Sequence, residues 1–374
     1  MTDDSTQAQA QAQAQALARP AARSFLADDD LTSAEQREVL ELALVLKSDR
    51  HAEQPYAGPR SVAIIFDKPT LRTQVSFTTG VAELGGYPLM VDGSLARIGT
   101  RESVEDVARV LGRQVAAIVW RTFHQRDLEQ MASFSGVPVV NALTDDFHPC
   151  QGLADLLTVA EHTGGLTARG PALAGRTFAY VGDGSNNMAH SYLLAGALAG
   201  MDVHIGCPPE YAPRADILAR AEAIAAETGA AVAVHHDARH AVAGADAVAT
   251  DTWVSMGQES EAALREAPFV SFRLDQDLLD VADPSAVVLH CLPAYRGKEI
   301  SAEVLDGPRA VVWDEAENRL HAQKAVLTFL ARRSLADAAD AADAADAADS
   351  ADSAASAAGA TVAGARGPGL EEEP

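Results

Sequence analysis

Residues 287–297, Val-Val-Leu-His-Cys-Leu-Pro-Ala-Tyr-Arg-Gly, place polar and nucleophilic side chains directly after a short apolar run. The apolar run is typical of a buried strand in a parallel sheet. Ligands of open α/β sheets bind beyond the carboxyl ends of the strands, where His290 and Cys291 would lie. We therefore expect Cys291 in a functional site. The alternative is a structural role, with Cys291 as a small buried apolar side chain.

Similar apolar runs alternate with helical patterns between about Ser24 and Ser334. The candidate strands are 61–66, 87–91, 116–120, 137–140, 177–181, 202–206, 231–235, 246–250, 287–291 and 310–313. Such alternation predicts parallel sheets with helices on both faces. Because the strands are too many for one simple sheet, we predict an α/β protein with two doubly wound parallel-sheet domains and an interdomain cleft.

Composition shifts suggest five segments. We expect a disordered Gln/Ala-rich N-terminus over 1–23, a first α/β domain over 24–152 and a second over 153–315. A helix over 316–334 would return to the first domain, and an acidic Ala/Asp-rich tail over 335–374 would be disordered. The terminal segments are predicted to be disordered because their low-complexity repeats offer no apolar face to bury.

The net charge of −24 limits the classes of partner, although the tail from Leu335 contributes eight of these negative charges. An acidic chain does not suit the phosphate backbone of nucleic acids. Uninterrupted apolar runs of about 18 residues, which a membrane span requires, do not occur. The three cysteines are widely spaced and form no CxxC pattern, which predicts a cytoplasmic protein without a disulfide framework. We therefore expect neither nucleic acid nor membrane as a partner.

Thr70-Leu71-Arg72-Thr73 follows the predicted strand 61–66 and opens a helix. A helix N-terminus presents unpaired N–H groups and the positive end of its dipole, which suit an anion. The two hydroxyls and the guanidinium fork match phosphate oxygens. We favour phosphate binding here over ordinary helix capping by Thr70 with a solvated Arg72.

Two further groups follow strands of the first half. Arg121 comes directly after 116–120, and His148-Pro149-Cys150-Gln151 follows 137–140 and its loop. A histidine beside an arginine and a glutamine can donate hydrogen bonds to a carbonyl oxygen as it gains negative charge. Each group alone is more typical of a structural loop, and Arg319, in Glu315–Arg319, alone resembles a solvated helix residue.

In the second half, Gly182-Asp183-Gly184 follows a strand and superficially resembles the turn of a dinucleotide-binding fold. Asn187 stands where the third glycine of that pattern belongs, so a nicotinamide-dependent dehydrogenase is the weaker alternative. Paired Asn186 and Asn187 suit a carboxylate or an amide. Asp251, after strand 246–250, can bind a substrate ammonium, or it can cap a turn.

Together the segments PTLRT, HPCQ, DGSNN, DTWVSMGQE and HCLPAYRG, with EAENR near the end, resemble the carbamoyltransferase family, in its ornithine-specific branch. The resemblance covers about residues 24–333. It implies transfer of the carbamoyl group of carbamoyl phosphate to the δ-amine of L-ornithine, giving L-citrulline and phosphate, within arginine biosynthesis. It further implies no metal ion and no organic cofactor, and a homotrimer with sites at subunit interfaces.

The resemblance also assigns residues. The implied catalytic residues are Cys291, Asp251, His148 and Arg121. The implied carbamoyl phosphate ligands are Thr70, Leu71, Arg72, Thr73, Arg97, Arg121, His148, Pro149, Cys150, Gln151, Cys291, Leu292 and Arg319. The implied ornithine ligands are Asn187, Asp251, Ser255 and Met256.

Two residues depart from the family pattern. Leu71 removes a hydroxyl from the phosphate motif, although its backbone N–H can still donate. Arg97 stands where the family usually has a glutamine that reaches into a neighbouring subunit's site. These departures leave a non-catalytic paralogue as an alternative. Relatives that use acylated ornithine are disfavoured, because a free α-amine needs the Asp251 carboxylate.

Overall fold

The computed structural model describes residues 22–68, 70–167, 170–253 and 262–363. The chain divides into one compact unit up to Ala331 and a second from Arg332 onward. The first unit contains both sheets and every site residue discussed below. None of the described helices has the length and apolar character needed to cross a bilayer.

The first sheet is parallel, with the order β2-β1-β3-β4. Its strands are β1 (Ser61–Phe66), β2 (Tyr87–Asp92), β3 (Ala117–Arg121) and β4 (Val139–Leu143). Ile64 packs into one apolar core, with α2 (Ser33–Ser48) and α3 (Arg72–Glu83), whereas Ile65 packs into another, with α5 (Val104–Leu111) and α6 (Gln125–Ser135). Both faces of β1 are therefore covered, which explains its continuous apolar run.

The second sheet is also parallel, with the order β11-β10-β7-β8-β9. Its strands are β7 (Thr177–Val181), β8 (Asp202–Gly206), β9 (Val232–His235), β10 (Ala247–Thr250) and β11 (Val287–Leu289). The helices that follow or precede them are α8 (Asn187–Leu198), α9 (Ala215–Thr228), α10 (Ala238–Val242), α11 (Ala262–Phe269), α12 (Gln276–Leu279) and α13 (Ala302–Leu305). The two sheets match the predicted α/β architecture.

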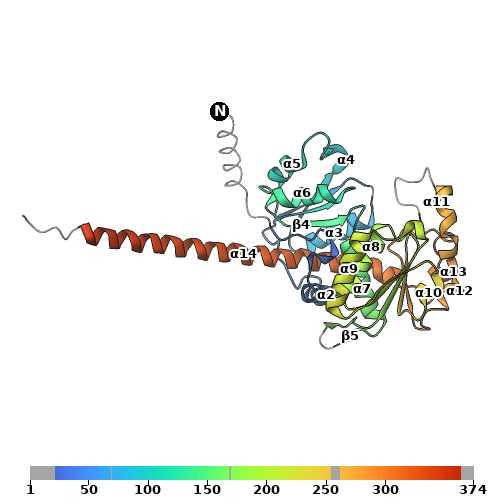
Figure 1. Cartoon of the computed structure of the whole chain (residues 1–374). Helices are drawn as coiled ribbons and strands as arrows, with labels where there is room; N and C mark the ends of the chain where they lie inside the picture. Colours follow the sequence, from blue (N-terminus) through green and yellow to red (C-terminus); the bar gives the residue numbers. More distant parts are fainter. Residues whose placement is uncertain (1–21, 69, 168–169, 254–261, 364–374) are drawn as a thin grey trace, which may run out of the picture. The chain divides into compact units, whose positions relative to one another are not determined.

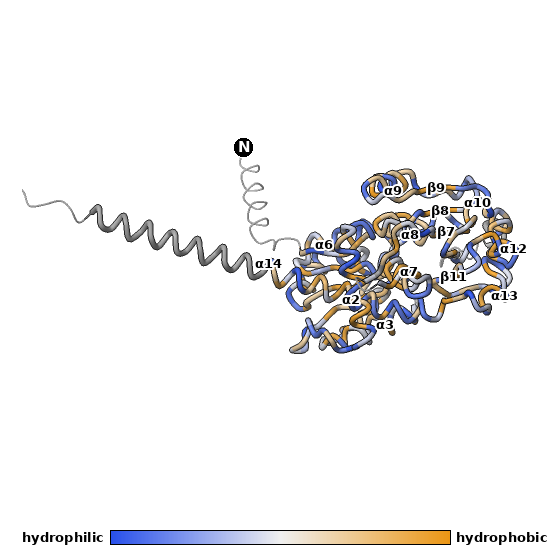
Figure 2. Tube along the Cα trace, turned by 90° about the horizontal axis from the view of Figure 1, so that it is seen from below, coloured by the Kyte–Doolittle hydropathy of each residue, from blue (hydrophilic) through white to orange (hydrophobic). Residues whose placement is uncertain are grey.

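Helix α7 (Pro149–His162) and helix α8 lie between helices α2, α3 and α6 on one side and strands β7, β8 and β11 on the other (Figure 2). Both helices are buried along nearly their whole length, and they pack into one core that spans the strands of both sheets. Short elements complete the body (Figure 1): η1 (Asp28–Asp30), α4 (Gly93–Ala96), β5 (Leu166–Thr167), β6 (Gly170–Pro171), η2 (Pro209–Tyr211) and η4 (Val270–Phe272). Helix α7 runs through the boundary proposed at residue 152.

The last helix, α14, runs from Val312 to Ala363. Its first part contacts the first domain: buried Lys324 binds Glu83 of α3 at 2.7 Å, and Tyr56 donates to the Leu327 carbonyl at 3.2 Å. Where disorder is expected from 335 onward, the structure shows helix up to Ala363. Alanine has the highest helix propensity, so the repeats can form helix without an apolar face.

Two local predictions are wrong, disorder over 335–363 and the last strand, whereas the predicted disorder of 1–21 and 364–374 lies outside the described residues. The segment 310–313 is no strand, because only Ala310 bridges Val288 before α14 begins. Asp314 and Glu315 just beyond it are typical of a first helical turn, where the helix dipole favours acids. The other nine predicted strands form within one or two residues at most boundaries.

Candidate active site

Three guanidinium groups from distant parts of the chain meet around Thr73. Arg319 of α14 donates to Thr73 Oγ1 at 2.6 Å, and Arg121 at the end of β3 lies 3.5 Å from the same oxygen. Arg72 in the first turn of α3 donates to the Leu292 carbonyl at 2.7 Å, which joins the first domain to the turn after β11. The structure thus brings together Arg72, Thr73, Arg121 and Arg319 of the residues predicted to bind carbamoyl phosphate.

The cluster holds positive charge with unused hydrogen-bond donors. The Nε atoms of Arg72, Arg121 and Arg319 are buried and have no hydrogen-bond partner among the described residues. Burial, and then the Arg319 charge, lower the pKa of Arg121 to about 10, and burial also lowers the pKa of Arg319. Both remain protonated at neutral pH. Because like charges buried together destabilise one another, the site is prepared for an anion of high charge.

The N-terminus of α3 adds backbone donors. Leu71 is its N-cap residue and makes no capping hydrogen bond with its side chain. The first N–H groups of this 12-residue helix therefore face the end where Arg72 and Thr73 lie, which favours an anion there. Leu71 itself is 73% exposed, so its side chain points into solvent while its backbone belongs to the motif.

His148 is the N-cap residue of α7, and Pro149 begins the helix. Burial, with the charges of Arg319 and Arg121, lowers the pKa of His148 well below its usual range. The imidazole is therefore neutral at pH 7, and its buried Nδ1 has no hydrogen-bond partner among the described residues. A neutral imidazole has one N–H, which can donate to a carbonyl oxygen.

Gln151 lies one turn further along α7, and its Oε1 accepts a hydrogen bond from Arg319 at 2.9 Å. Cys150 does not face the arginines: its thiol donates to the Asn141 carbonyl of β4 at 3.5 Å, and burial raises its pKa to about 12. The thiol is therefore not directed at the arginine cluster, and the ligand role of Cys150 stays a prediction. Its thiol points to β4 because successive helical residues face different directions.

Cys291 lies beside Asp251, as their strand-end positions predict. The Cys291 thiol donates to Asp251 Oδ1 at 3.3 Å. Burial and the Asp251 carboxylate raise the pKa of Cys291 well above its usual range, so it is a thiol at neutral pH. A thiolate base or nucleophile at this position would need a pKa shifted in the opposite direction.

His290 is held in place on both sides of its ring. Its Nδ1 accepts from the Leu292 N–H at 3.0 Å, so its Nε2 donates to buried Glu299 at 3.2 Å. Asp251, His290 and Cys291 each offer a polar atom within 4.8 Å of the others. Neither nitrogen of His290 is free to ligate a metal ion, so we assign no metal site to these three residues. The φ of 57° at Leu292 turns its carbonyl toward Arg72.

The predicted ornithine ligands are described only in part. Asn187 begins α8 and donates to the Thr144 carbonyl at 2.7 Å, which links α8 to the first domain. Ser255 and Met256 lie outside the described residues. The turn at Gly184 requires a glycine, since a Cβ there would lie 2.7 Å from the Tyr211 carbonyl and 2.8 Å from Cys207 Sγ.

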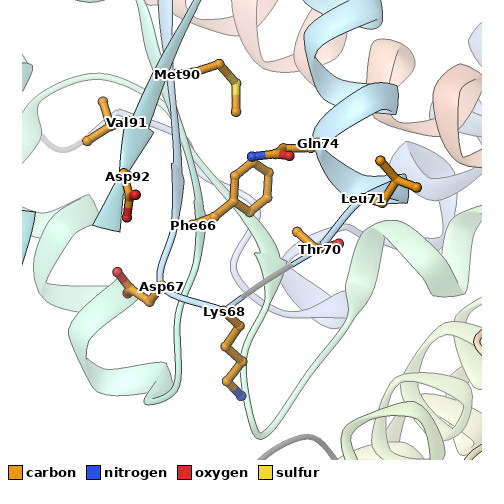
Figure 3. A pocket seen from close by; sticks show the side chains of 9 residues that line it. All are labelled: Phe66, Asp67, Lys68, Thr70, Leu71, Gln74, Met90, Val91 and Asp92. Carbon is orange, nitrogen blue, oxygen red and sulfur yellow. The ribbon is translucent and has the colours of Figure 1, made fainter. Parts of the chain in front are cut away.

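A pocket of about 700 Å³ adjoins the phosphate motif (Figure 3). It is lined by Phe66, Asp67, Lys68, Thr70, Leu71, Gln74, Met90, Val91 and Asp92. Phe66, Gln74 and Met90 gather on one side, whereas Lys68 points away from them and binds Asp145 at 2.5 Å. Arg97 is exposed on the loop after α4, with a φ of 51°, and among the described residues no hydrogen bond or ion pair joins its side chain to the arginine cluster.

The sequence does not predict a layer of buried polar residues that lies beneath the site. Asp155 and Glu315 contact Gln151, and Ser191 accepts from the His148 N–H at 2.9 Å while it donates to buried Asp28 at 2.7 Å. The only signal in the sequence is the spacing of Gln151 and Asp155, which are four residues apart on one helix face.

Comparisons with known proteins agree with this geometry. A family model described as the carbamoyl-P binding domain of aspartate/ornithine carbamoyltransferase matches residues 23–161, and one described as the Asp/Orn binding domain of the same family matches 174–330. An ornithine carbamoyltransferase of Bifidobacterium longum subsp. infantis is 57% identical over 318 residues, which cover 85% of this chain and 98% of the relative.

Solved structures are similar as well. The ornithine carbamoyltransferase of Pyrococcus furiosus is 42% identical with a TM-score of 0.76, over 82% of this chain and 96% of that chain. The anabolic ornithine carbamoyltransferase of Campylobacter jejuni is 35% identical with a TM-score of 0.76, over 82% and 98%. A mutant N-acetyl-L-ornithine transcarbamylase complexed with PALAO is 32% identical with a TM-score of 0.73, over 82% and 99%.

Proposed function

This chain belongs to the aspartate/ornithine carbamoyltransferase family and is a carbamoyltransferase, and from this premise we propose that it carbamoylates the δ-amine of L-ornithine. One observation carries the proposal: three guanidinium groups with unpaired Nε atoms surround Thr73, beside a neutral His148. This arrangement suits a substrate that combines a phosphate with a carbonyl group.

The first half of the reaction uses the arginine cluster. The phosphate of carbamoyl phosphate would bind Arg72, Arg319, Thr73 and the N–H groups at the start of α3. The carbonyl oxygen would accept hydrogen bonds from His148 and Arg121. These donors already occupy fixed positions, so they can stabilise the negative charge that develops on this oxygen during attack, without reorganisation.

The second half delivers the nucleophile. The neutral δ-amine attacks the carbamoyl carbon and forms a C–N bond, the carbonyl π-electrons move onto oxygen, and a tetrahedral intermediate results. When the carbonyl re-forms, the C–O bond to phosphate breaks, and phosphate leaves with the electron pair and takes up the proton that the nitrogen loses. Asp251 is proposed to bind the α-ammonium of ornithine. The Cys291 thiol would hold the Asp251 carboxylate in position through its hydrogen bond.

Free ornithine is the acceptor that Asp251 supports. A carboxylate stabilises a substrate ammonium, whereas an acylated α-nitrogen carries no charge to pair with it. Formation of citrulline for arginine biosynthesis is the proposed direction, which the similarity to the anabolic Campylobacter jejuni enzyme supports. Three free thiols, two of them buried, support a reducing cytoplasm as the location.

A homotrimer is the proposed assembly, in which Arg97 serves the site of a neighbouring copy. Exposed apolar side chains near the pocket support a protein partner there. They are Leu71, Val75, Leu89, Met90 and Leu95. Arg97 directly follows α4, is exposed and is separate from its own cluster, which fits a role in another copy.

The proposal is tested by incubating the full chain with carbamoyl phosphate and, in parallel, L-ornithine, N-acetyl-L-ornithine, putrescine or L-aspartate. We expect citrulline from ornithine at a rate at least about a hundredfold above the other products. Arg72→Ala serves as the inactive reference and Arg113→Ala, an exposed arginine in the turn that precedes β3, as the matched control. Citrulline no faster than with Arg72→Ala, or a preference for another acceptor, would overturn the proposal.

A further inference from the structure

Two carboxyl groups lie buried together beneath Gln151. Asp155 of α7 and Glu315 in the first turn of α14 are both 0% exposed, and both contact the same amide group. Gln151 Nε2 donates to Asp155 Oδ1 at 2.7 Å and to Glu315 Oε1 at 3.1 Å. The pair comes from segments far apart in the sequence, so tertiary packing alone brings it together.

The remaining oxygens of the pair are also used. Asp155 Oδ2 accepts from the Tyr192 hydroxyl of α8 at 2.8 Å, and Glu315 Oε2 accepts from the His290 N–H at 2.8 Å. The pair therefore touches α7, α8, α14 and the turn after β11. It joins both sheets directly behind the carbamoyl phosphate site.

Two carboxylates offer only acceptors, so a direct contact between these two buried groups would require a proton. Burial raises the pKa of both Asp155 and Glu315, and the charge of Asp155 raises that of Glu315 further. The charged and titratable groups that face the pair are Arg319 of α14, Tyr192 of α8 and the Cys291 thiol. Arg319 is the cation among them, so it balances one negative charge but not two.

The pair fixes which way the Gln151 amide points. Because the oxygens nearest to Gln151 accept hydrogen bonds from it, its NH₂ group must face the pair. Its carbonyl oxygen then faces Arg319 and the site. A reversed amide would place its oxygen against carboxyl oxygens and leave Arg319 without this acceptor.

We propose that Asp155 and Glu315 share a single proton and form a positioning pair that presents the Gln151 carbonyl oxygen to the amino group of the carbamoyl substrate. The inference rests on the proposed function and deepens it. The pair acts through Gln151 and Arg319 and does not itself touch substrate. Loss of the shared proton at alkaline pH would place two negative charges in contact and displace Gln151.

Steady-state kinetics of the full chain separate this role from a merely structural one. Glu315→Gln keeps one negative charge and can still donate to Asp155 and accept from the His290 N–H. We expect it to keep KM for carbamoyl phosphate within about threefold of the unmodified protein. Glu315→Ala removes these contacts and should raise KM about tenfold or more. Competitive inhibition by inorganic phosphate, which lacks the carbamoyl amino group, should change less than about threefold in both variants.

The pH profile gives the second readout. In the unmodified protein, KM for carbamoyl phosphate should rise on the alkaline side as the shared proton is lost, and this rise should be absent in Glu315→Gln. If KM for carbamoyl phosphate rose as much in Glu315→Gln as in Glu315→Ala, the proposal of a shared proton would be overturned. If phosphate inhibition in Glu315→Ala weakened by the same factor as KM for carbamoyl phosphate rose, the pair would not act specifically on the carbamoyl group.

A measurement without turnover keeps this inference distinct from the proposed function. A group whose pKa is raised by folding stabilises the folded state at low pH, and this contribution is lost as pH rises toward the folded-state pKa. The fall in Tm between pH 6 and pH 9 should therefore be smaller in Glu315→Gln than in the unmodified protein. Equal falls in Tm in the two proteins would contradict the shared proton even if citrulline is made. A smaller fall in Glu315→Gln, in a chain that makes no citrulline, would overturn only the proposed function.

Discussion

The two halves of the candidate site are constructed differently. The phosphate half is assembled from α3, β3, α7 and α14, and its side chains are tied to one another by hydrogen bonds across more than 160 residues of sequence. The acceptor half rests on Asp251 and Cys291, two adjacent strand ends joined by one thiol–carboxylate contact. The phosphate half is therefore preorganised for charge, and we expect it to supply most of the rate acceleration.

The largest effect should follow removal of a guanidinium from the preorganised half. Arg319→Ala removes the donors to both Thr73 and Gln151 and should lower kcat/KM about a thousandfold or more. Initial rates of citrulline formation at saturating ornithine measure the loss. Arg113→Ala is the matched control and should retain full activity. A reduction below about tenfold in Arg319→Ala would show that the cluster is not the main source of catalysis.

A smaller, selective effect is expected in the acceptor half. Asp251→Asn removes the charge that pairs with the ornithine ammonium and should lower kcat/KM for ornithine about a hundredfold. Inhibition by inorganic phosphate should stay unchanged, because phosphate binds the other half. Exposed Asp277→Asn is the control. If the variant lost phosphate inhibition as well, the two halves would not be separable as described.

Cys291 should be a poor nucleophile despite its position. Because its pKa is raised, it should react with iodoacetamide at pH 7 at least about tenfold more slowly than a free cysteine in solution. Cys291→Ser, which keeps a donor to Asp251, should retain activity within about tenfold. Mass spectrometry of the alkylated peptide measures the rate. Rapid alkylation at pH 6–7 would instead reveal a thiolate and contradict the raised pKa.

The smallest effect is expected at the departure from the family pattern. Leu71 contributes backbone rather than side chain to the phosphate motif, since its side chain is exposed. Leu71→Thr should therefore change KM for carbamoyl phosphate less than about threefold. Thr73→Val is the contrasting substitution, because it removes a hydroxyl that faces two arginines. It should raise KM for carbamoyl phosphate at least about tenfold. Equal responses at the two positions would contradict this division of the motif.

The fold and part of the site could be predicted because both follow local rules. Buried parallel strands require continuous apolar runs, and ligand-binding residues lie at their carboxyl ends, which located Arg121, Asp251 and Cys291. The segment 310–313 shows the limit, because a short apolar run serves a strand or a helix start equally well.

The rest depends on contacts between distant residues. Arg319 looks like a solvated helix residue by itself, yet it is 4% exposed because α14 packs against α3 and α7. Asp155 and Glu315 carry no local signal beyond the spacing of Gln151 and Asp155, since acids on helices are ordinarily exposed. The protonation of Cys291 likewise depends on burial and on Asp251, which spacing along the chain does not reveal.

Calorimetric titration of inorganic phosphate into the full chain at pH 7.5 tests the preorganised anion site most directly, because it needs neither acceptor nor turnover. We predict saturable binding that weakens at least about tenfold in Arg72→Ala and is unchanged in Arg113→Ala. Equal affinity in all three proteins, or no binding to the unmodified chain, would contradict a site assembled from Arg72, Arg121 and Arg319.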